Sequence, residues 1–374
     1  MERVTSSLTA RTLASEAHLP TGEPVRPLAK AGFQRSLGQI IRTQSTTESA
    51  MSLRLVFAAL CLTAAAPAAE AQSTQAGFER VVTSDGNEVG VWYPASGTSS
   101  HQRLGLYTQN VVIGAPVPVG KYPLVVISHG TGGDFAGHVD TAVALARAGF
   151  IVAALTHPGD NWRDNSRATR IEERPAALSA TISYMVRAWP GHAAIDPGRI
   201  GAFGFSSGGF TVLAAAGGRP DLSRLSDHCA AHPNFFDCTL LKAQPRRVTA
   251  PWPDLRDARL KAIVVAAPAL GFAFDHAGLA AIRMPVQLWR ADDDHILPAP
   301  FYADAVKAAL PNRPEFHAVP GAGHFDFLAP CADPGSMPQI CVSGSGFDRA
   351  AFHESFDNAV VQFFSNKLAT MRRD

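Results

Sequence analysis

The hydrophobic pattern of this chain alternates between two kinds of segment. Short runs that are almost entirely apolar predict strands buried on both faces. They cover residues 124–127, 150–155, 200–203, 262–266 and 285–289. Segments with helical spacing lie between or after them, at residues 141–148, 175–189 and 358–368. This alternation predicts an α/β fold, with a mostly parallel central sheet and helices on both faces.

The segment 88–94 has a different pattern, because polar and apolar residues alternate along it. Such alternation is typical of an antiparallel strand with one exposed face. We therefore expect an early antiparallel strand here, near one edge of the sheet.

A G-x-S-x-G motif occupies residues 204–208, directly after the strand predicted at 200–203. Residues 210–216, which follow it, are largely apolar and helix-like. This strand, turn and helix are the setting of a nucleophile elbow, in which a strained backbone exposes a serine hydroxyl above the sheet. The motif therefore predicts that Ser206 is a nucleophile.

A serine hydroxyl is a weak nucleophile, so Ser206 requires a histidine to take its proton and a carboxylate to orient that histidine. Among the 13 histidines His324 is best placed, because the glycines before it permit a tight loop back to the elbow. The carboxylate candidates after the strand at 285–289 are Asp292, Asp293 and Asp294. The alternatives are a structural histidine and an ordinary acidic surface turn.

Residues 128–133 read S-H-G-T-G-G and follow the strand predicted at 124–127. A loop of this kind can supply backbone N–H donors to the oxyanion of a tetrahedral intermediate. We assign these donors to the N–H groups of Thr131 and Ser207. His129 then has a structural role or, alternatively, a direct catalytic one. A phosphate cradle is the competing interpretation of the loop, although it lacks the GK[ST] ending of a P-loop.

These segments, with H-P-G-D at 157–160 and A-G-H-F-D-F-L-A-P-C at 322–331, resemble a known family. Residues from about 78 to 366 are similar to serine α/β-hydrolases, and most similar to the bacterial dienelactone hydrolase-like proteins. Those proteins are related to platelet-activating-factor acetylhydrolases and to polyester-cleaving cutinases. True dienelactone hydrolases carry a cysteine nucleophile where this chain has Ser206. The resemblance therefore implies a carboxylic ester hydrolase and not a dienelactone substrate.

The resemblance also selects the acid. α/β-Hydrolases commonly place it four residues before a proline, and Asp294 stands in that relation to Pro298, with Asp293 as the alternative. The implied reaction passes through an acyl-enzyme and requires no cofactor or metal. A lipase, a phospholipid acyl hydrolase and a polyester hydrolase would use the same residues. A hydrolase-fold binding protein without turnover is the alternative from another class.

Composition limits the choice of partners. Hydrophobic residues make up 46% of the 374 positions and charged residues 17%, which is sufficient for one large core. A formal net charge of +1 without a basic stripe argues against a nucleic-acid partner. The expected partner is a small-molecule or lipid ester substrate, and the oligomeric state stays open.

The beginning of the chain predicts export. Residues 51–71 combine a short basic start, an apolar stretch and an A-x-A cleavage site, as in a secretory signal peptide. An uncleaved membrane anchor is the alternative, although the stretch is short and rich in alanine for a stable span. We expect residues 1–50 to be a disordered extension or to precede the true start at Met51. Residues 72–374 would then form the α/β-hydrolase domain of a secreted or periplasmic protein.

The cysteines agree with an oxidising compartment. Removal of residues 51–71 eliminates Cys61 and leaves four cysteines. Proximity in sequence favours the pairs Cys229–Cys238 and Cys331–Cys341, although four cysteines allow three connectivities. Four reduced, buried thiols in a cytosolic protein are the alternative.

Residues from about 219 to 260 form an insertion between the elbow helix and the strand predicted at 262–266. Aromatic residues and prolines are frequent in it, among them Phe235, Phe236 and Trp252. We expect either a cap over Ser206 that sets substrate preference or a surface excursion held by its own disulfide.

Overall fold

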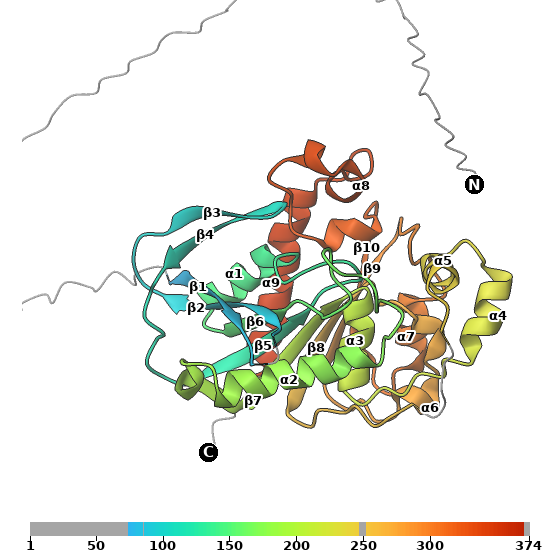
Figure 1. The fold of residues 1–374 in the computed structure, drawn as a ribbon, viewed down its shortest axis with the longest axis horizontal. Helices are drawn as coiled ribbons and strands as arrows, with labels where there is room; N and C mark the ends of the chain where they lie inside the picture. The colour runs from blue at the N-terminus through green and yellow to red at the C-terminus, as the bar shows by residue number, and fades with distance from the viewer. Residues whose placement is uncertain (1–73, 85, 247–251, 370–374) are drawn as a thin grey trace, which may run out of the picture. The chain divides into compact units, whose positions relative to one another are not determined.

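The computed structural model describes residues 74–84, 86–246 and 252–369 (Figure 1). The signal peptide predicted at 51–71 and the extension predicted at 1–50 lie outside the described residues. Within the described ranges, no helix has both the length and the apolar character that crossing a bilayer requires.

In the described part of the chain, ten strands form one sheet in the order β10-β9-β8-β7-β5-β6-β2-β1-β4-β3. They are β1 (Gln75–Val82), β2 (Glu88–Ala95), β3 (Ser100–Leu104), β4 (Tyr107–Ile113), β5 (Tyr122–Ser128), β6 (Ile151–Leu155), β7 (Ile195–Phe205), β8 (Leu260–Ala266), β9 (Val286–Ala291) and β10 (Glu315–Val319). From β6 to β10 neighbouring strands run parallel. The mostly parallel sheet predicted from the sequence is confirmed.

The antiparallel strand predicted at 88–94 is β2, which pairs antiparallel with both β1 and β6. It lies farther inside the sheet than predicted, because β1, β4 and β3 extend the sheet beyond it. The β3–β4 hairpin forms this edge of the sheet, and its strand β4 pairs with β1. The sequence of β3 is S-H-Q-R-L, and its mixed exposure leaves no apolar run to identify it.

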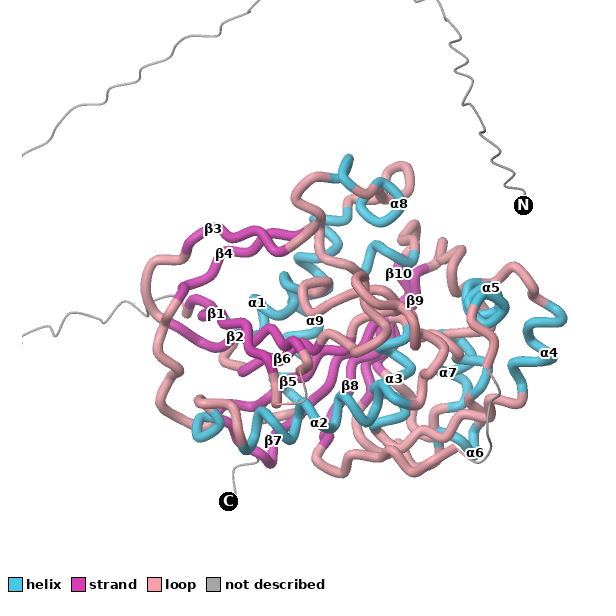
Figure 2. The backbone as a smooth tube through the Cα atoms, in the orientation of Figure 1, coloured by secondary structure: helices cyan, strands magenta, loops and turns pink. Residues whose placement is uncertain are grey.

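The four longest described helices pack against the sheet: α1 (Val139–Arg147), α2 (Glu173–Arg187), α3 (Ser207–Ala215) and α9 (Arg349–Lys367). Figures 1 and 2 show α2 and α3 on one side of the strands and α1 and α9 on the other. The closing helix α9 begins earlier than the predicted segment 358–368. Asp348 caps it by accepting a hydrogen bond from the Ala351 N–H at 3.0 Å, and such a cap sets the start of a helix.

Alternate residues of the parallel strands enter two separate cores. Along β5, Leu124 and Val126 pack in the core that contains α2 and α3 residues, whereas Val125 and Ile127 pack in the core that contains α1 and α9 residues. None of these four side chains is more than 2% exposed. Burial on both faces explains why the central stretches of these strands are almost entirely apolar, since each fully buried aliphatic side chain contributes about 1.5–3 kcal/mol.

The predicted insertion contains two short helices, α4 (Arg224–Ala231) and α5 (Phe236–Ala243). A disulfide between Cys229 and Cys238 connects them. A second disulfide joins Cys331 to Cys341, at the end of α8 (Pro338–Cys341). These are the pairs that proximity in the sequence favoured. The remaining short helices, α6 (His276–Leu279) and α7 (Ala303–Ala309), lie on either side of β9 in the sequence.

Candidate active site

The predicted site residues follow the carboxyl ends of neighbouring parallel strands. Ser128, at the end of β5, stands opposite Gly204 of β7, and Phe205 of β7 stands opposite Ala266 of β8. The loops that leave these strands therefore meet at one edge of the sheet, where open α/β sheets bind their ligands.

Ser206 lies between β7 and α3 in a strained backbone conformation. Its φ of 55° and ψ of −120° fall in a region that residues other than glycine rarely adopt. Its N–H donates to the Ala266 carbonyl at 3.0 Å, and its own carbonyl accepts from Phe210 and Ala269. These bonds hold the serine in the sharp turn predicted from the motif.

The two glycines of the motif are required by close backbone approach. A Cβ atom on Gly204 would lie 2.1 Å from the Gly208 carbonyl oxygen, and one on Gly208 would lie 1.9 Å from the Ser128 carbonyl oxygen. Both contacts are with backbone atoms, which cannot move aside as a flexible side chain does. The G-x-S-x-G spacing is therefore imposed by the turn between β7 and α3.

Ser206, His324 and Asp294 form one chain of hydrogen-bond distances. His324 Nε2 lies 3.1 Å from Ser206 Oγ, and His324 Nδ1 lies 2.7 Å from Asp294 Oδ2. All three residues are buried. The structure brings Asp294 to this histidine, whereas the alternative acid Asp293 is exposed. An ionised Asp294 accepts a hydrogen bond from the Nδ1–H of His324, which leaves Nε2 as the basic atom toward the serine hydroxyl.

Asp294 is held as an acceptor by its own loop. Its Oδ1 accepts from the backbone N–H groups of Ile296 at 2.9 Å and Leu297 at 2.7 Å. Burial raises the pKa of this carboxyl, but His324 and the two N–H donors outweigh burial and lower it below its ordinary value. The carboxylate that faces His324 is therefore kept ionised.

Thr131 and Ser207 lie side by side at the edge of the site. Their hydroxyl oxygens are 2.7 Å apart. Ser207 is the first residue of α3, and the N–H groups of a first helical turn have no carbonyl partner within the helix. Gly132 has φ 72°, a left-handed conformation that turns the loop after Thr131. The structure thus brings together the two residues predicted to donate to an oxyanion.

Sequence analysis missed the ion pair that anchors this loop. Arg174 of α2 donates from Nη1 to Asp160 Oδ2 at 2.5 Å and from Nη2 to the His129 carbonyl. Asp160 Oδ1 accepts from the Gly132 N–H at 3.0 Å. Both charged side chains are 3% exposed. Because His129 and Gly132 flank Thr131, the pair fixes the backbone on both sides of that residue.

His129 is part of the loop's internal hydrogen bonding. Its Nε2 accepts from the His157 N–H at 2.9 Å, so its Nδ1 carries the proton that it shares with the Gly130 carbonyl at 2.6 Å. Burial, with the charge of Arg174, lowers the pKa of His129 well below its ordinary range. This neutral ring, with both nitrogens engaged, occupies a structural position.

The loop that carries His324 has its own anchor, which sequence analysis also missed. Asp326 Oδ2 accepts from the Gly323 N–H at 2.8 Å, directly before the histidine. Asp326 Oδ1 accepts from Arg349 Nε at 3.0 Å and from the Ser343 hydroxyl. Asp326 and Arg349 are both buried. This pair joins the histidine loop to the first turn of α9.

Two clusters of described residues have the composition of a metal site. They are Asp140, His353 and Asp357, and His228, Asp237 and Cys238. Asp140 Oδ2 lies 2.6 Å from His353 Nδ1, closer than the roughly 3.3 Å that separates two ligands of one tetrahedral ion. Cys238 is bonded in a disulfide, so it offers no thiolate. Neither cluster has the geometry of a metal centre.

Known proteins resemble this chain over different portions of its length. A family model described as platelet-activating factor acetylhydrolase, isoform II, matches residues 98–185. A curated relative, NocK of Nocardia uniformis subsp. tsuyamanensis, is assigned provisionally by its name to the esterases. It is 31% identical over 123 residues, which is 32% of this chain and 36% of NocK. The matched region is therefore about a third of the relative's length.

A solved structure shares the fold over most of the chain. Ferulic acid esterase from Streptomyces cinnamoneus superposes with a TM-score of 0.52 and 20% sequence identity, over 82% of this chain and 93% of that chain. The mostly parallel sheet and this likeness show that the chain has the α/β-hydrolase fold. The resemblance to the platelet-activating-factor acetylhydrolase branch, predicted from the motifs, is confirmed over residues 98–185.

Proposed function

We propose that this protein hydrolyses carboxylic esters through a Ser206–His324–Asp294 triad. The observation that supports the proposal most strongly is the hydrogen-bond chain from Ser206 Oγ through both ring nitrogens of His324 to Asp294, with spacings of 3.1 and 2.7 Å. It stands at the carboxyl edge of the sheet, on a serine held in a strained turn. A nucleophile, a base and an orienting acid in this order are what acyl transfer requires.

In the proposed reaction, Ser206 Oγ attacks the ester carbonyl carbon while His324 Nε2 takes the hydroxyl proton. The tetrahedral intermediate collapses as the C–O bond to the alcohol breaks, and His324 returns the proton to the leaving oxygen. Water then attacks the acyl-enzyme with the same proton transfers, which releases the acid and restores Ser206. Asp294 orients His324 and stabilises its protonated form throughout.

The oxyanion of each intermediate would accept hydrogen bonds from the N–H groups of Thr131 and Ser207. The start of α3 adds the positive end of its helix dipole at this point. Loss of one such donor typically costs about 3 kcal/mol of barrier, or roughly a hundredfold in rate. The buried Asp160–Arg174 pair supports this role, because it holds the backbone around Thr131 in place before substrate binds.

The related proteins support an ester hydrolase, since the family model and both relatives carry esterase or acetylhydrolase names. A lipase, a phospholipid acyl hydrolase and a polyester hydrolase would share the same triad. A binding protein without turnover would have no need of the Asp294 loop, whose carboxylate and backbone donors are organised around one imidazole. We therefore favour the enzyme.

Hydrolysis of p-nitrophenyl butyrate by the intact protein tests the proposal. Turnover by wild type, with a loss of about a thousandfold or more in Ser206→Ala, is the expected result. A thermal melt of the variant shows whether it is folded. Equal turnover by folded Ser206→Ala would rule out the serine mechanism.

Export is part of the same proposal. The two disulfides favour an oxidising compartment such as the periplasm or the exterior of the cell. The signal peptide predicted at residues 51–71 would deliver the protein there. N-terminal sequencing of protein from its native host is expected to begin at Gln72, and a mature chain that retained residues 51–71 would contradict it.

A further inference from the structure

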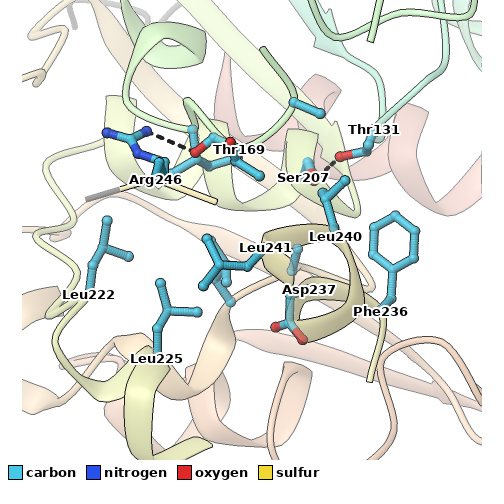
Figure 3. A pocket seen from close by; sticks show the side chains of 14 residues that line it. Thr131, Thr169, Ser207, Leu222, Leu225, Phe236, Asp237, Leu240, Leu241 and Arg246 are labelled. Carbon is cyan, nitrogen blue, oxygen red and sulfur yellow. Dashed lines mark hydrogen bonds between the residues drawn. The ribbon is translucent and has the colours of Figure 1, made fainter. Parts of the chain in front are cut away.

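A small apolar cavity opens beside the two oxyanion residues. Its volume is about 60 Å³, and it extends from Thr131 and Ser207 toward the insertion (Figure 3). Leucines from the insertion form much of the wall: Leu222, Leu225, Leu240 and Leu241. Other apolar residues that line it are Ala168, Ile171, Ala269 and Leu270. The insertion is therefore one wall of a cavity at the site.

The position of the cavity indicates which half of an ester it would receive. The leaving oxygen of the ester must lie within hydrogen-bond reach of His324 Nε2, because that atom protonates it. Among the described residues, Thr131 and Ser207 line the cavity, whereas Ser206 and His324 do not. The acyl chain is the substituent on the carbonyl carbon that points away from His324. We therefore expect the cavity to receive the acyl chain.

The volume limits the length of that chain. A water-sized probe occupies about 10–15 Å³, so a cavity of about 60 Å³ has room for roughly four to six heavy atoms. Pockets that hold a drug-sized ligand are several times larger, at about 300 Å³ or more. An acyl chain of more than about six carbons would have to extend beyond these walls.

The wall that the insertion forms is fixed in place, so it does not widen for a longer acyl chain. The Cys229–Cys238 disulfide joins α4, which carries Leu225, to α5, which carries Leu240 and Leu241. Behind α4, the His228 ring stacks on Phe272 with centroids 3.6 Å apart. These contacts fix the two short helices against the loop after β8.

Arg246, a cation that lines the cavity, is paired with Glu172. Arg246 donates to both carboxylate oxygens of Glu172, at 2.5 and 2.8 Å. It also donates to the Thr169 carbonyl at 2.8 Å. A bidentate pair of this kind leaves little charge for an anionic ligand.

Asp237 also lines the cavity, and the described groups that donate hydrogen bonds to it are neutral. Asp237 accepts from the Tyr302 hydroxyl at 3.0 and 3.1 Å, and in Figure 3 its carboxylate points away from Ser207. His228 does not offset this charge, since burial, with His232, lowers the pKa of His228 to about 4. Burial also raises the pKa of Asp237, so a second carboxylate in the cavity would meet apolar walls and a carboxyl group that already resists ionisation.

We propose that this cavity is the acyl subsite and that it selects uncharged, apolar acyl groups of about four to six carbons. The assignment rests on the proposed ester hydrolysis and names its substrate class. Leu240 and Leu241 determine the chain length, and Asp237 disfavours acyl groups that end in a carboxylate.

The first test is a series of p-nitrophenyl esters from acetate to decanoate. Each methylene that enters the cavity is worth roughly fourfold, so kcat/KM is expected to rise from acetate to a maximum between butyrate and hexanoate. Decanoate is expected at least about tenfold below that maximum. A flat profile, or a maximum at decanoate, would overturn the assigned length.

Three variants test the wall. Leu241→Ala enlarges the cavity and is expected to move the maximum toward octanoate, whereas Leu240→Phe narrows it and is expected to move the maximum toward acetate. Leu106→Ala removes the same atoms from a half-buried leucine that packs against the other core, and it is expected to leave the profile unchanged. The proposal fails if the two cavity variants keep the wild-type profile.

The charge is tested with two acyl groups of equal length. Mono(p-nitrophenyl) adipate carries a terminal carboxylate, and p-nitrophenyl hexanoate does not. We expect the hexanoate to be preferred by about a hundredfold, and Asp237→Asn to reduce that preference about tenfold. Equal use of both esters by wild type would overturn the charge selection.

Failure of this subsite and failure of the proposed function give different results. If the protein reacts with a fluorophosphonate and hydrolyses the acetate ester, but the cavity substitutions leave its chain-length profile unchanged, the acyl chain of the substrate binds elsewhere. A folded protein without labelling and without turnover of any ester is no serine esterase.

Discussion

Arg174 and Asp160 form a buried ion pair that connects α2 to both sides of Thr131. Nη1 of the arginine lies 2.5 Å from Oδ2 of the aspartate. The arginine also holds the His129 carbonyl, and the aspartate holds the Gly132 N–H. The pair reaches the proposed oxyanion donor only through the backbone, so both residues act by positioning.

Asp160→Asn is expected to lower kcat about ten- to hundredfold with little change in KM, because a displaced donor weakens the transition state more than the bound ester. The variant leaves Arg174 buried without its counter-charge, at a cost of about 3–5 kcal/mol in stability. The double variant Asp160→Asn/Arg174→Met removes both charges and is expected to regain stability without regaining kcat. A double variant with wild-type kcat would show that the pair does not position the loop. Arg170→Met, which breaks an exposed pair with Glu173, is the control.

Asp294→Asn is expected to lower kcat by about 10³- to 10⁴-fold, because an amide no longer fixes the tautomer of His324 or stabilises its protonated form. Asp293→Asn, at the exposed neighbour, is expected to retain activity. Steady-state kinetics of the two variants with one ester decide between the candidate acids. A larger loss in Asp293→Asn would reverse the assignment.

The contact between α1 and α9 predicts a dependence of stability on pH. Asp140 Oδ2 lies 2.6 Å from His353 Nδ1. Burial lowers the pKa of His353, but Asp140 outweighs burial and raises it above its ordinary 6.5. Burial and Asp140 also raise the pKa of Asp357. A group whose pKa is raised in the folded state stabilises the fold at every pH below its pKa in the unfolded state. This stabilisation is lost as pH rises through its pKa in the folded state.

The melting temperature is therefore expected to fall as pH rises from 6 upward, by about 2–4 °C for each kcal/mol lost. His353→Gln cannot titrate and is expected to flatten this dependence. His317→Gln, at a more exposed pair with Glu315, is the control and is expected to keep it. An unchanged slope in His353→Gln, measured by calorimetry across this range, would contradict the assignment.

The Cys331–Cys341 disulfide closes a loop of ten residues beside the His324 loop. Replacing both cysteines by serine is expected to cost about 2.7 kcal/mol in the chain-entropy model. Chemical denaturation with and without the bond measures this cost. A difference near zero would mean that the native contacts of α8 alone order this segment.

The buried parts of the fold could be predicted from the sequence because their pattern is local. The central positions of strands such as β5 and β8 are all apolar, since both faces of the sheet are covered there. The hairpin of β3 and β4 could not be predicted in the same way, because Ser100–Leu104 is exposed or half-exposed throughout. Its place in the sheet depends on pairing with β1 through β4, which is a long-range contact.

The same distinction applies to the site. The serine turn is local, and its glycines are imposed by backbone contacts, so the motif predicts it. Arg174 is different, because an arginine in a helical segment has the same local pattern whether it faces solvent or a buried aspartate. Asp160 had a signal in the H-P-G-D segment, but its partner is 14 residues away. The insertion likewise revealed its aromatic residues but not that its leucines line a cavity with Thr131 and Ser207.

Fluorophosphonate labelling followed by intact-mass measurement tests the role of Ser206 most directly. Ser206→Ala removes the proposed nucleophile, and Ser207→Ala removes the adjacent hydroxyl while keeping its N–H. We predict one adduct on wild type and on Ser207→Ala, none on folded Ser206→Ala, and ester hydrolysis lost with the adduct. An adduct of equal yield on Ser206→Ala, or turnover that survives this substitution, would contradict the serine mechanism.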